Sequence, residues 1–254
     1  MSQTLYIIAA GLGTRMGSIS VPKALLPTRG NKPNVLNSIE QAYPYYDKIF
    51  VIGNELVHKV WDEFESSLPV AFAEKVKVKT IKSGLGDGHA VLTALNDFTD
   101  ESNSEYVSIL WGDAYIPDEG IFKEITEYDC AYGNASGVIP VVFEDNPYVT
   151  IMMNNMMDVV GADFSKRGES HASGMHDQSL FKFRRKTLLD ALVQMHCAYW
   201  KNGRYVTDSG ELTFLYVLHY LFNSGQEATC YPTEYPVHGY NTKDEFDAIK
   251  VQTN

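Results

Sequence analysis

Residues 7–17, IIAAGLGTRMG, and residues 22–27, PKALLP, decide the expected fold and chemistry of this chain. A short apolar run enters a glycine-rich loop that carries Arg15, and Lys23 follows eight residues later. Glycine has no Cβ atom, so the backbone N–H groups of such a loop can approach a phosphate chain closely. Arg15 and Lys23 add fixed positive charge where a pyrophosphate group would lie. The two stretches therefore predict a buried strand, a phosphate-binding loop and a cationic site.

The composition is that of a folded, acidic protein. The 254 residues are 44% hydrophobic and 12% aromatic, which suffices for a core in one large α/β domain or two small ones. The formal net charge of −11 argues against nucleic-acid binding as the main role, because no basic stripe can neutralise a phosphate backbone. Three widely spaced cysteines form no CxxC motif, and the first apolar run is too short for a signal peptide. We therefore expect a cytoplasmic protein.

Hydrophobic periodicity predicts alternating strands and helices over the first half of the chain. The expected strands cover Leu5 to Ala10, Lys48 to Gly53, Val76 to Ile81 and Tyr106 to Leu110, and the expected helices cover Val35 to Tyr43, Glu55 to Ser67 and His89 to Phe98. This alternation implies a Rossmann-like, mostly parallel sheet with helices on both faces. Ligands bind such sheets at the carboxyl ends of the strands. Gly11, Gly84 and Asp113 follow such ends, so we expect three separate segments to converge on one site.

The second half of the chain is less regular. The expected strands cover Val138 to Val142, Tyr148 to Met152 and Ser179 to Phe183, and the expected helices cover Lys186 to Cys197, Leu212 to Phe222 and Phe246 to Lys250. The segment 166–177, KRGESHASGMHD, is polar and contains glycine, which predicts a mobile loop. His171, His176 and Asp177 in this segment fit no zinc spacing, and we interpret them as solvated loop residues.

A glycine-rich loop after a strand also opens dinucleotide-binding sites. Here the glycines at 11, 13 and 17 make G-x-G-x-x-x-G, whereas the dinucleotide fingerprint is G-x-G-x-x-G. The expected second strand ends only at Gly53, so no acidic residue lies at its end about 20 residues after the glycines. No G-K-[ST] follows the loop, which excludes a Walker A motif. Lys23, in the context PKALLP, has no role in a dinucleotide-binding fold.

The stretches 7–17 and 22–27 resemble the signature of nucleotidyltransferases that join a nucleoside triphosphate to a phosphorylated acceptor. Sugar-1-phosphate nucleotidyltransferases and phosphocholine cytidylyltransferases belong to that family. The resemblance implies a GT-A-like nucleotidyltransferase fold, with residues 1–130 as the nucleotide-binding half and 131–254 as the acceptor-binding part of one domain. It also implies Mg²⁺ as cofactor, and Arg15 and Lys23 as catalytic residues. We expect no nucleic-acid or membrane partner, and a monomer or a homodimer.

Two residues resemble the metal ligands of this family. Asp113, in LWGDAYI, comes just after a buried strand, and Mg²⁺ commonly takes one or two carboxylate ligands together with substrate phosphates. Asn241, in HGYNTKDE, matches the second ligand, and Thr242 and Glu245 beside it form a capping-box pattern before a helix. The alternatives are a turn or cap aspartate for Asp113 and an ordinary turn asparagine for Asn241.

The segment 84–90, GLGDGHA, is similar to the family motif L-G-T-G-H-A, which borders the nucleoside base. The resemblance assigns these residues to nucleotide binding: Ala9, Ala10, Gly11, Gly13, Thr14, Gly86, Asp87 and Gly88. Asp87 replaces the usual threonine, and Ile81 replaces the glutamine that reads uracil, so we expect CTP in preference to UTP. The Asp87 carboxylate could accept a hydrogen bond from the cytosine amino group, or it could cap the helix that begins near His89.

Acceptor contacts carry the weakest signals. Glu211, after Ser209-Gly210, resembles a G-E segment near the acceptor pocket of the family. Arg184, in the basic run 182–186, could hold an acceptor phosphate, or the run could be a strand edge and a solvated helix start. We expect L-glutamine phosphate as acceptor, and phosphocholine next, in capsule or surface-polymer synthesis. The alternatives are a sugar-1-phosphate nucleotidyltransferase that uses UTP, dTTP or GTP, and a non-catalytic nucleotide-binding regulatory module.

Overall fold

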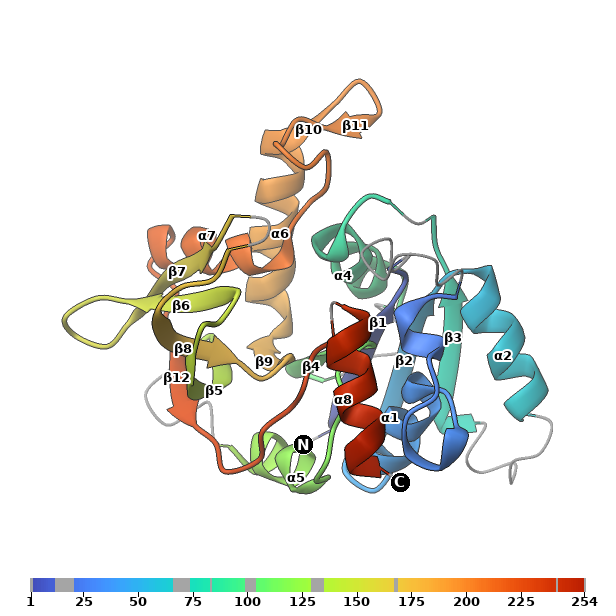
Figure 1. Ribbon diagram of the computed structural model, residues 1–254. Coiled ribbons are helices and arrows are strands. Elements are labelled where there is room, and N and C mark those ends of the chain that lie inside the picture. The colour runs from blue at the N-terminus through green and yellow to red at the C-terminus, as the bar shows by residue number, and fades with distance from the viewer. Residues whose placement is uncertain are drawn as a thin grey trace.

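The computed structural model describes residues 2–11, 21–65, 74–82, 84–98, 104–128, 135–166, 169–240 and 242–253. Within these ranges, one eight-stranded sheet has the order β12-β5-β9-β4-β1-β2-β3, and β8 also pairs with β5 (Figure 1). Its strands are β1 (Thr4–Ala9), β2 (Lys48–Gly53), β3 (Val76–Thr80), β4 (Tyr106–Trp111), β5 (Gly137–Asp145), β8 (Ser173–Asp177), β9 (Leu180–Arg184) and β12 (Ala228–Pro232). Because β9 pairs with both β4 and β5, the sheet joins the two halves of the chain.

Helices cover both faces of this sheet (Figure 1). They are α1 (Asn34–Ala42), α2 (Glu55–Glu65), α4 (Asp87–Asp97), α5 (Gly120–Glu127), α6 (Arg185–Tyr199), α7 (Val217–Asn223) and α8 (Lys243–Thr253). Successive strand side chains point to opposite faces. Tyr6 and Ile8 of β1 pack in one core cluster with residues of α4, α6 and α7, while Leu5 and Ile7 pack in a second cluster with residues of α1, α2 and α5. The central strand β1 is therefore buried on both sides.

The predicted architecture of the first half is confirmed. Strands β3, β2, β1 and β4 are parallel neighbours, and the predicted elements of this half begin and end within two residues of the observed ones, except that the last two residues of the helix predicted over Glu55 to Ser67 lie outside the described residues. Helix α5 was not predicted. It buries Ile121, Phe122 and Ile125 on one side, which is the periodicity of a short amphipathic helix.

The second half differs from the prediction in several places. Strand β9 runs antiparallel to β4 and β5, and β12 enters the sheet parallel to β5 although no strand was predicted there. Two small antiparallel pairs, β6 (Val149–Met153) with β7 (Val159–Phe164) and β10 (Trp200–Lys201) with β11 (Arg204–Tyr205), lie outside the main sheet. The predicted mobile loop over 166–177 is wrong for its last five residues, which form β8 because their backbone pairs with Val141–Asp145 of β5.

The basic run 182–186 is also only partly a solvated segment. Lys182 is 5% exposed, and its Nζ atom donates hydrogen bonds to the carbonyl oxygens of Ile125, Thr126 and Tyr128. These carbonyls lie at the C-terminal end of α5, where the helix carries partial negative charge. The ammonium group of Lys182 therefore stabilises a helix end inside the protein.

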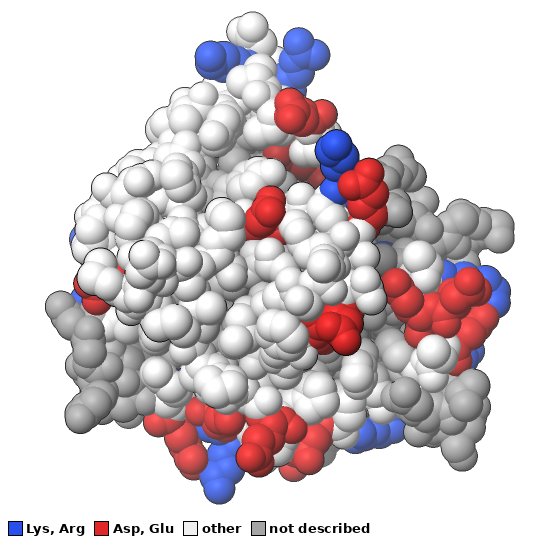
Figure 2. All heavy atoms as spheres, turned by 60° about the vertical axis from the view of Figure 1, so that its left-hand side comes forward, with Lys and Arg blue, Asp and Glu red and all other residues white. Residues whose placement is uncertain are grey.

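Figure 2 shows a face of the molecule on which Lys, Arg, Asp and Glu lie mostly at the rim, and its centre is largely uncharged. No continuous track of Lys and Arg crosses this face. Among the residues that the structure describes, no helix has the length and apolarity needed to cross a bilayer.

Candidate functional site

Lys23 and Asp113 meet at the carboxyl end of β4. Lys23 begins the short 3-10 helix Lys23–Leu25, and Asp113 follows β4 after one glycine. The Nζ atom of Lys23 donates to Oδ2 of Asp113 across 3.1 Å. The side chain of Lys23 is 12% exposed and that of Asp113 is 36% exposed. The carboxylate is therefore accessible from solvent, while its ammonium partner is held in the protein.

Gly112 lets the Asp113 loop lie directly against the end of β1. Its N–H donates to the carbonyl oxygen of Ile8 across 2.8 Å. A Cβ atom at this position would lie 2.9 Å from both the Ile8 oxygen and the Ala9 Cβ atom, so a larger residue would push the loop outward. The loop therefore lies beside Ala9, Ala10 and the start of the predicted phosphate-binding loop.

A segment from the C-terminal region crosses this site. Tyr115 and His238 form an antiparallel bridge with N–H to carbonyl distances of 2.9 and 3.0 Å. The Tyr240 hydroxyl, on a fully buried side chain, donates to the Lys23 carbonyl oxygen across 2.9 Å. One segment thus contacts both the Asp113 loop and the Lys23 backbone, although about 125 residues separate it from the former along the chain.

Four predicted site residues, Gly13, Thr14, Arg15 and Asn241, lie outside the described residues. The capping box next to Asn241 is confirmed. The Thr242 N–H donates to Glu245 Oε2 across 3.0 Å, and the Glu245 N–H donates to Thr242 Oγ1 across 3.3 Å, just where α8 begins.

The predicted base-binding loop packs against the loop that carries Glu211. The Leu212 N–H donates to the Leu85 carbonyl across 2.9 Å, and the Gly88 N–H donates to the Leu212 carbonyl across 2.8 Å. Gly86 has a φ of 94°, and a Cβ atom there would lie 2.4 Å from the Leu212 oxygen. Glycine is therefore required at 86 by both conformation and close approach. Glu211 itself is exposed at the edge of this contact.

Asp87 connects the two loops through its carboxylate. Its Oδ1 atom accepts the N–H groups of Gly88 and Phe214, each at 2.8 Å, at the first turn of α4. Burial raises the pKa of Asp87 to about 6, the two backbone hydrogen bonds oppose the shift, and the charge of Glu211 adds to it. Gly86 is the N-cap of α4 and Asp87 is its first residue, so the carboxylate does not cap the helix in the strict sense. Its two bonds to backbone N–H groups favour a structural role in the first turn over a direct contact with the base.

We predict a pH-dependent contribution of Asp87 to stability. The native carboxyl group holds its proton up to about pH 6, whereas an ordinary aspartate has a pKa of 3.8, so the folded state binds more protons between these values. We compare the free energy of unfolding of the wild type with that of Asp87→Asn, which has no titrating group at this position. The difference, wild type minus variant, should fall by roughly 1–3 kcal/mol as the pH rises from about 4 to about 6. Urea unfolding across this range measures it, with the exposed Asp208→Asn as control. A difference that stays constant with pH would contradict the assignment.

Arg184 does not join the site, and this prediction is wrong. Strand β9 is antiparallel to β4, so Arg184 pairs with Tyr106 at the start of β4, whereas Asp113 follows the end of that strand. Its Nη2 atom donates to the Tyr106 hydroxyl across 3.0 Å, and its Nε atom lies 3.5 Å from Glu105. The guanidinium group therefore lies near the amino end of β4, whereas Asp113 lies beyond the carboxyl end of that strand.

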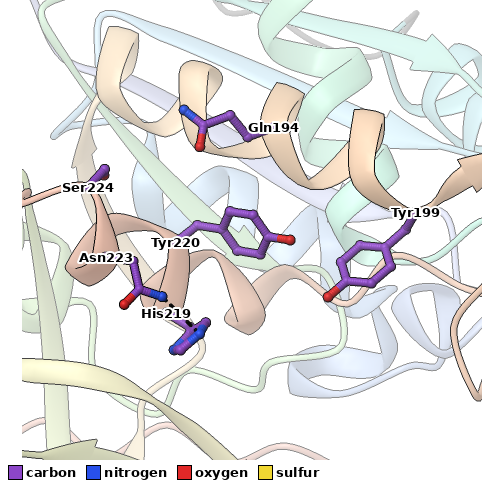
Figure 3. A pocket seen from close by; sticks show the side chains of 6 residues that line it. All are labelled: Gln194, Tyr199, His219, Tyr220, Asn223 and Ser224. Carbon is purple, nitrogen blue, oxygen red and sulfur yellow. Dashed lines mark hydrogen bonds between the residues drawn. The ribbon is translucent and has the colours of Figure 1, made fainter.

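A hollow of about 410 Å³ between α6 and α7 is separate from this site (Figure 3). Six residues line it: Gln194, Tyr199, His219, Tyr220, Asn223 and Ser224. None of the six is Lys or Arg, and α6 and α7 cover the face of the sheet opposite to the cluster that holds Ala24 and Leu25 next to Lys23. The described residues that line the hollow thus offer no Lys or Arg side chain to a triphosphate.

Asp113 suits a hard divalent cation that is shared with a substrate. Its accessible carboxylate already attracts the ammonium group of Lys23, so the position favours positive charge. No group of three or more His, Cys, Asp and Glu side chains that could hold a metal occurs in the described ranges. Mg²⁺ does not need such a group, because it usually takes one or two protein carboxylates and completes its shell with phosphate oxygens and water.

Known proteins are similar to this chain in sequence. The family described as the MobA-like NTP transferase domain matches residues 5–172. The bifunctional protein GlmU of Methanococcus maripaludis (strain C5) is 28% identical over 171 residues, which are 64% of this chain and 38% of the relative. GlmU of Caldicellulosiruptor saccharolyticus is 26% identical over 219 residues, 82% of this chain and 44% of the relative. The chain thus spans less than half the length of these curated relatives.

Solved structures share the fold along the whole chain. HddC from Yersinia pseudotuberculosis, complexed with GMP-PN, superimposes with a TM-score of 0.70 at 18% identity, and the match covers 100% of both chains. The CTP:phosphocholine cytidylyltransferase LicC from Streptococcus pneumoniae gives a TM-score of 0.69 at 13% identity, again over 100% of both chains. A UDP-glucose pyrophosphorylase complexed with UDP-glucose gives 0.73 at 14% identity, over 99% of this chain and 98% of its own. The predicted nucleotidyltransferase fold is therefore confirmed.

Proposed function

The chain belongs to the family of MobA-like NTP transferase domains, and on this premise we propose that it transfers a nucleotidyl group from a nucleoside triphosphate to a phosphorylated acceptor, with release of pyrophosphate. The observation that carries the proposal is the Lys23–Asp113 pair at the carboxyl end of a parallel strand. It puts a held cation and an accessible carboxylate where ligands bind such sheets.

The proposed reaction needs charge neutralisation and alignment more than acid–base chemistry. The nucleophile is a phosphate oxygen of the acceptor, and with a second pKa near 6 this group is largely ionised at neutral pH. Lys23 stabilises the α-phosphate and the incoming oxygen, and Arg15 holds the leaving pyrophosphate. Asp113, with Asn241, would hold Mg²⁺, which supplies positive charge against the phosphate oxygens when bound.

We further propose CTP as the nucleotide and a small phosphorylated metabolite as the acceptor, with L-glutamine phosphate first and phosphocholine second, in capsule or surface-polymer synthesis. Ile81 supports CTP, because it takes the place of the glutamine that reads uracil in the resembled family. Its N–H donates to the Gly53 carbonyl across 2.9 Å and its side chain packs against the core. A hydrocarbon side chain packed in this way cannot donate to or accept from a uracil edge.

The second candidate is a sugar-1-phosphate nucleotidyltransferase that uses UTP, dTTP or GTP. The similarity to GlmU sequences and to a UDP-glucose pyrophosphorylase structure favours it. A screen for pyrophosphate release with four nucleoside triphosphates against a panel of phosphorylated acceptors separates the two candidates. Nucleotide binding without release for every pair would favour a non-catalytic regulatory module.

We predict that kcat/KM is higher for CTP than for UTP, and that Asp87→Thr keeps this preference while lowering both values. The reason is that Asp87 Oδ1 already accepts two backbone N–H groups, so its loss loosens the loop without removing a contact with the base. Steady-state kinetics of both proteins with both nucleotides measure this. A wild-type preference for UTP would refute the choice of base. Loss of the preference for CTP in Asp87→Thr would show that Asp87 takes part in recognition of the base.

A further inference from the structure

We propose that Asn34, at the start of α1, is a positioning residue that fixes the backbone on both sides of Asp113. Its side chain is 1% exposed. The Nδ2 atom donates to the carbonyl oxygen of Gly112 across 3.0 Å and to that of Ala114 across 2.8 Å. One amide group therefore binds the two residues that flank the proposed metal ligand, and the backbone around Asp113 cannot shift without straining at least one of these bonds. In its metal role, this inference rests on the proposed function.

The hydrogen bonds around Asn34 agree on the orientation of its amide. The two carbonyl oxygens can only accept, so the NH₂ group must face them. The opposite atom, Oδ1, accepts the Thr28 hydroxyl across 3.1 Å, and that hydroxyl in turn accepts from Asn37 Nδ2 across 2.9 Å. Each donor in this buried chain has an acceptor, so the network is satisfied in one arrangement and resists rearrangement.

We call the Asn34 amide with its bonds to Gly112 and Ala114 the clamp, and the helix that carries it is packed in the core. Asn34 is the first residue of α1, whose Val35, Leu36 and Ile39 side chains are buried in a core cluster. The amide therefore extends from a packed helix and not from a loop. Side chains that orient a metal ligand in this way typically change metal affinity or activity by about 10- to 100-fold when they are replaced.

Asn34→Leu tests the clamp, because leucine has a similar size and neither a charge nor a donor. Asn37→Leu is the matched control, since the Asn37 side chain lies in the same network and, among the described residues, donates to Thr28, Arg29 and Lys32 and not to the Asp113 loop. Amide hydrogen exchange of the metal-free protein reports the backbone directly. In Asn34→Leu we expect at least about tenfold faster exchange at Gly112, Ala114 and Tyr115, with no such change in Asn37→Leu.

Metal binding is the second measurement. Free Mn²⁺ is followed by electron paramagnetic resonance while Mn²⁺ is added to the protein in the presence of CTP. We expect about tenfold weaker Mn²⁺ binding in Asn34→Leu, and wild-type binding in Asn37→Leu. Thr28→Val removes the hydroxyl group that orients the Asn34 amide, so it should show smaller changes in amide exchange and in Mn²⁺ binding. This variant replaces Asn34→Leu in the test if Asn34→Leu does not fold.

The proposal is overturned if Asn34→Leu has the amide exchange rates and the Mn²⁺ affinity of the wild type. It is overturned as well if Asn37→Leu changes these two quantities as strongly as Asn34→Leu does. It is also overturned if the exchange rises and Mn²⁺ binding does not change. The exchange measurement uses neither nucleotide nor metal. A wild-type protein that releases no pyrophosphate with any substrate pair would therefore count against the proposed function only. In that case, the amide hydrogen exchange rates would still decide whether Asn34 fixes the backbone around Asp113.

Discussion

Asp113→Asn is expected to lower the rate of pyrophosphate release by about a thousandfold or more, which corresponds to about 4 kcal/mol of transition-state stabilisation. The amide that replaces the carboxylate is neutral, so the site loses the charge that would hold Mg²⁺ against the triphosphate. The backbone contacts of Gly112 and Tyr115 do not involve this side chain, so the loop should keep its shape. Steady-state kinetics over a range of Mg²⁺ concentrations measure the effect.

Asp145→Asn is the matched control, because Asp145 is an exposed aspartate at the end of β5. It should release pyrophosphate at the wild-type rate. Near-native turnover by a folded Asp113→Asn protein would show that the metal assignment is wrong, whichever nucleotide is used.

Lys23→Ala is expected to lower kcat by about a hundredfold and to change the KM for the nucleotide little. The charge of Lys23 is most useful when the acceptor attacks, and a group that acts in the transition state lowers kcat when it is removed. Arg15→Ala should differ by raising the KM as well, because the predicted pyrophosphate contact of Arg15 already exists in the ground state. Kinetics with both substrates varied separate the two effects.

Lys32→Ala controls for the loss of a lysine from the same region, since Lys32 pairs with Glu40 and not with Asp113. It should leave both kinetic parameters near their wild-type values. Identical changes of every parameter in Lys23→Ala and Arg15→Ala would contradict the division of roles. Loss of the ion pair at 3.1 Å also removes the partner of Asp113, so thermal unfolding of Lys23→Ala belongs in the same experiment.

The site is built mainly from backbone contacts and small residues around a few charges. Gly112 and Gly86 allow the backbones of distant segments to approach, and a larger residue at either position would meet main-chain atoms. Lys23 and Asp113 provide the charges directly beside Gly112.

The sequence by itself determined the central parallel strands, the helices between them, and the position of Asp113 after a strand end. These features are local. A strand that is buried on both faces is a continuous apolar run, and a covering helix shows its own periodicity, whatever its partner is. The capping box of Thr242 and Glu245 belongs to the same class, because its residues are three positions apart and interact directly.

Only the tertiary structure decided which distant segments meet. A hydrophobic pattern reports that a segment is buried but not the direction in which it pairs, so the sequence could not show that Arg184 lies at the start of β4 and away from Asp113. The same limit hid the strand at 173–177, whose polar residues carry little strand signal and are ordered by pairing with β5. The contacts of Asn34 with Gly112 and Ala114 span 78 and 80 residues, and such a bond exists only after the core has packed the two segments together.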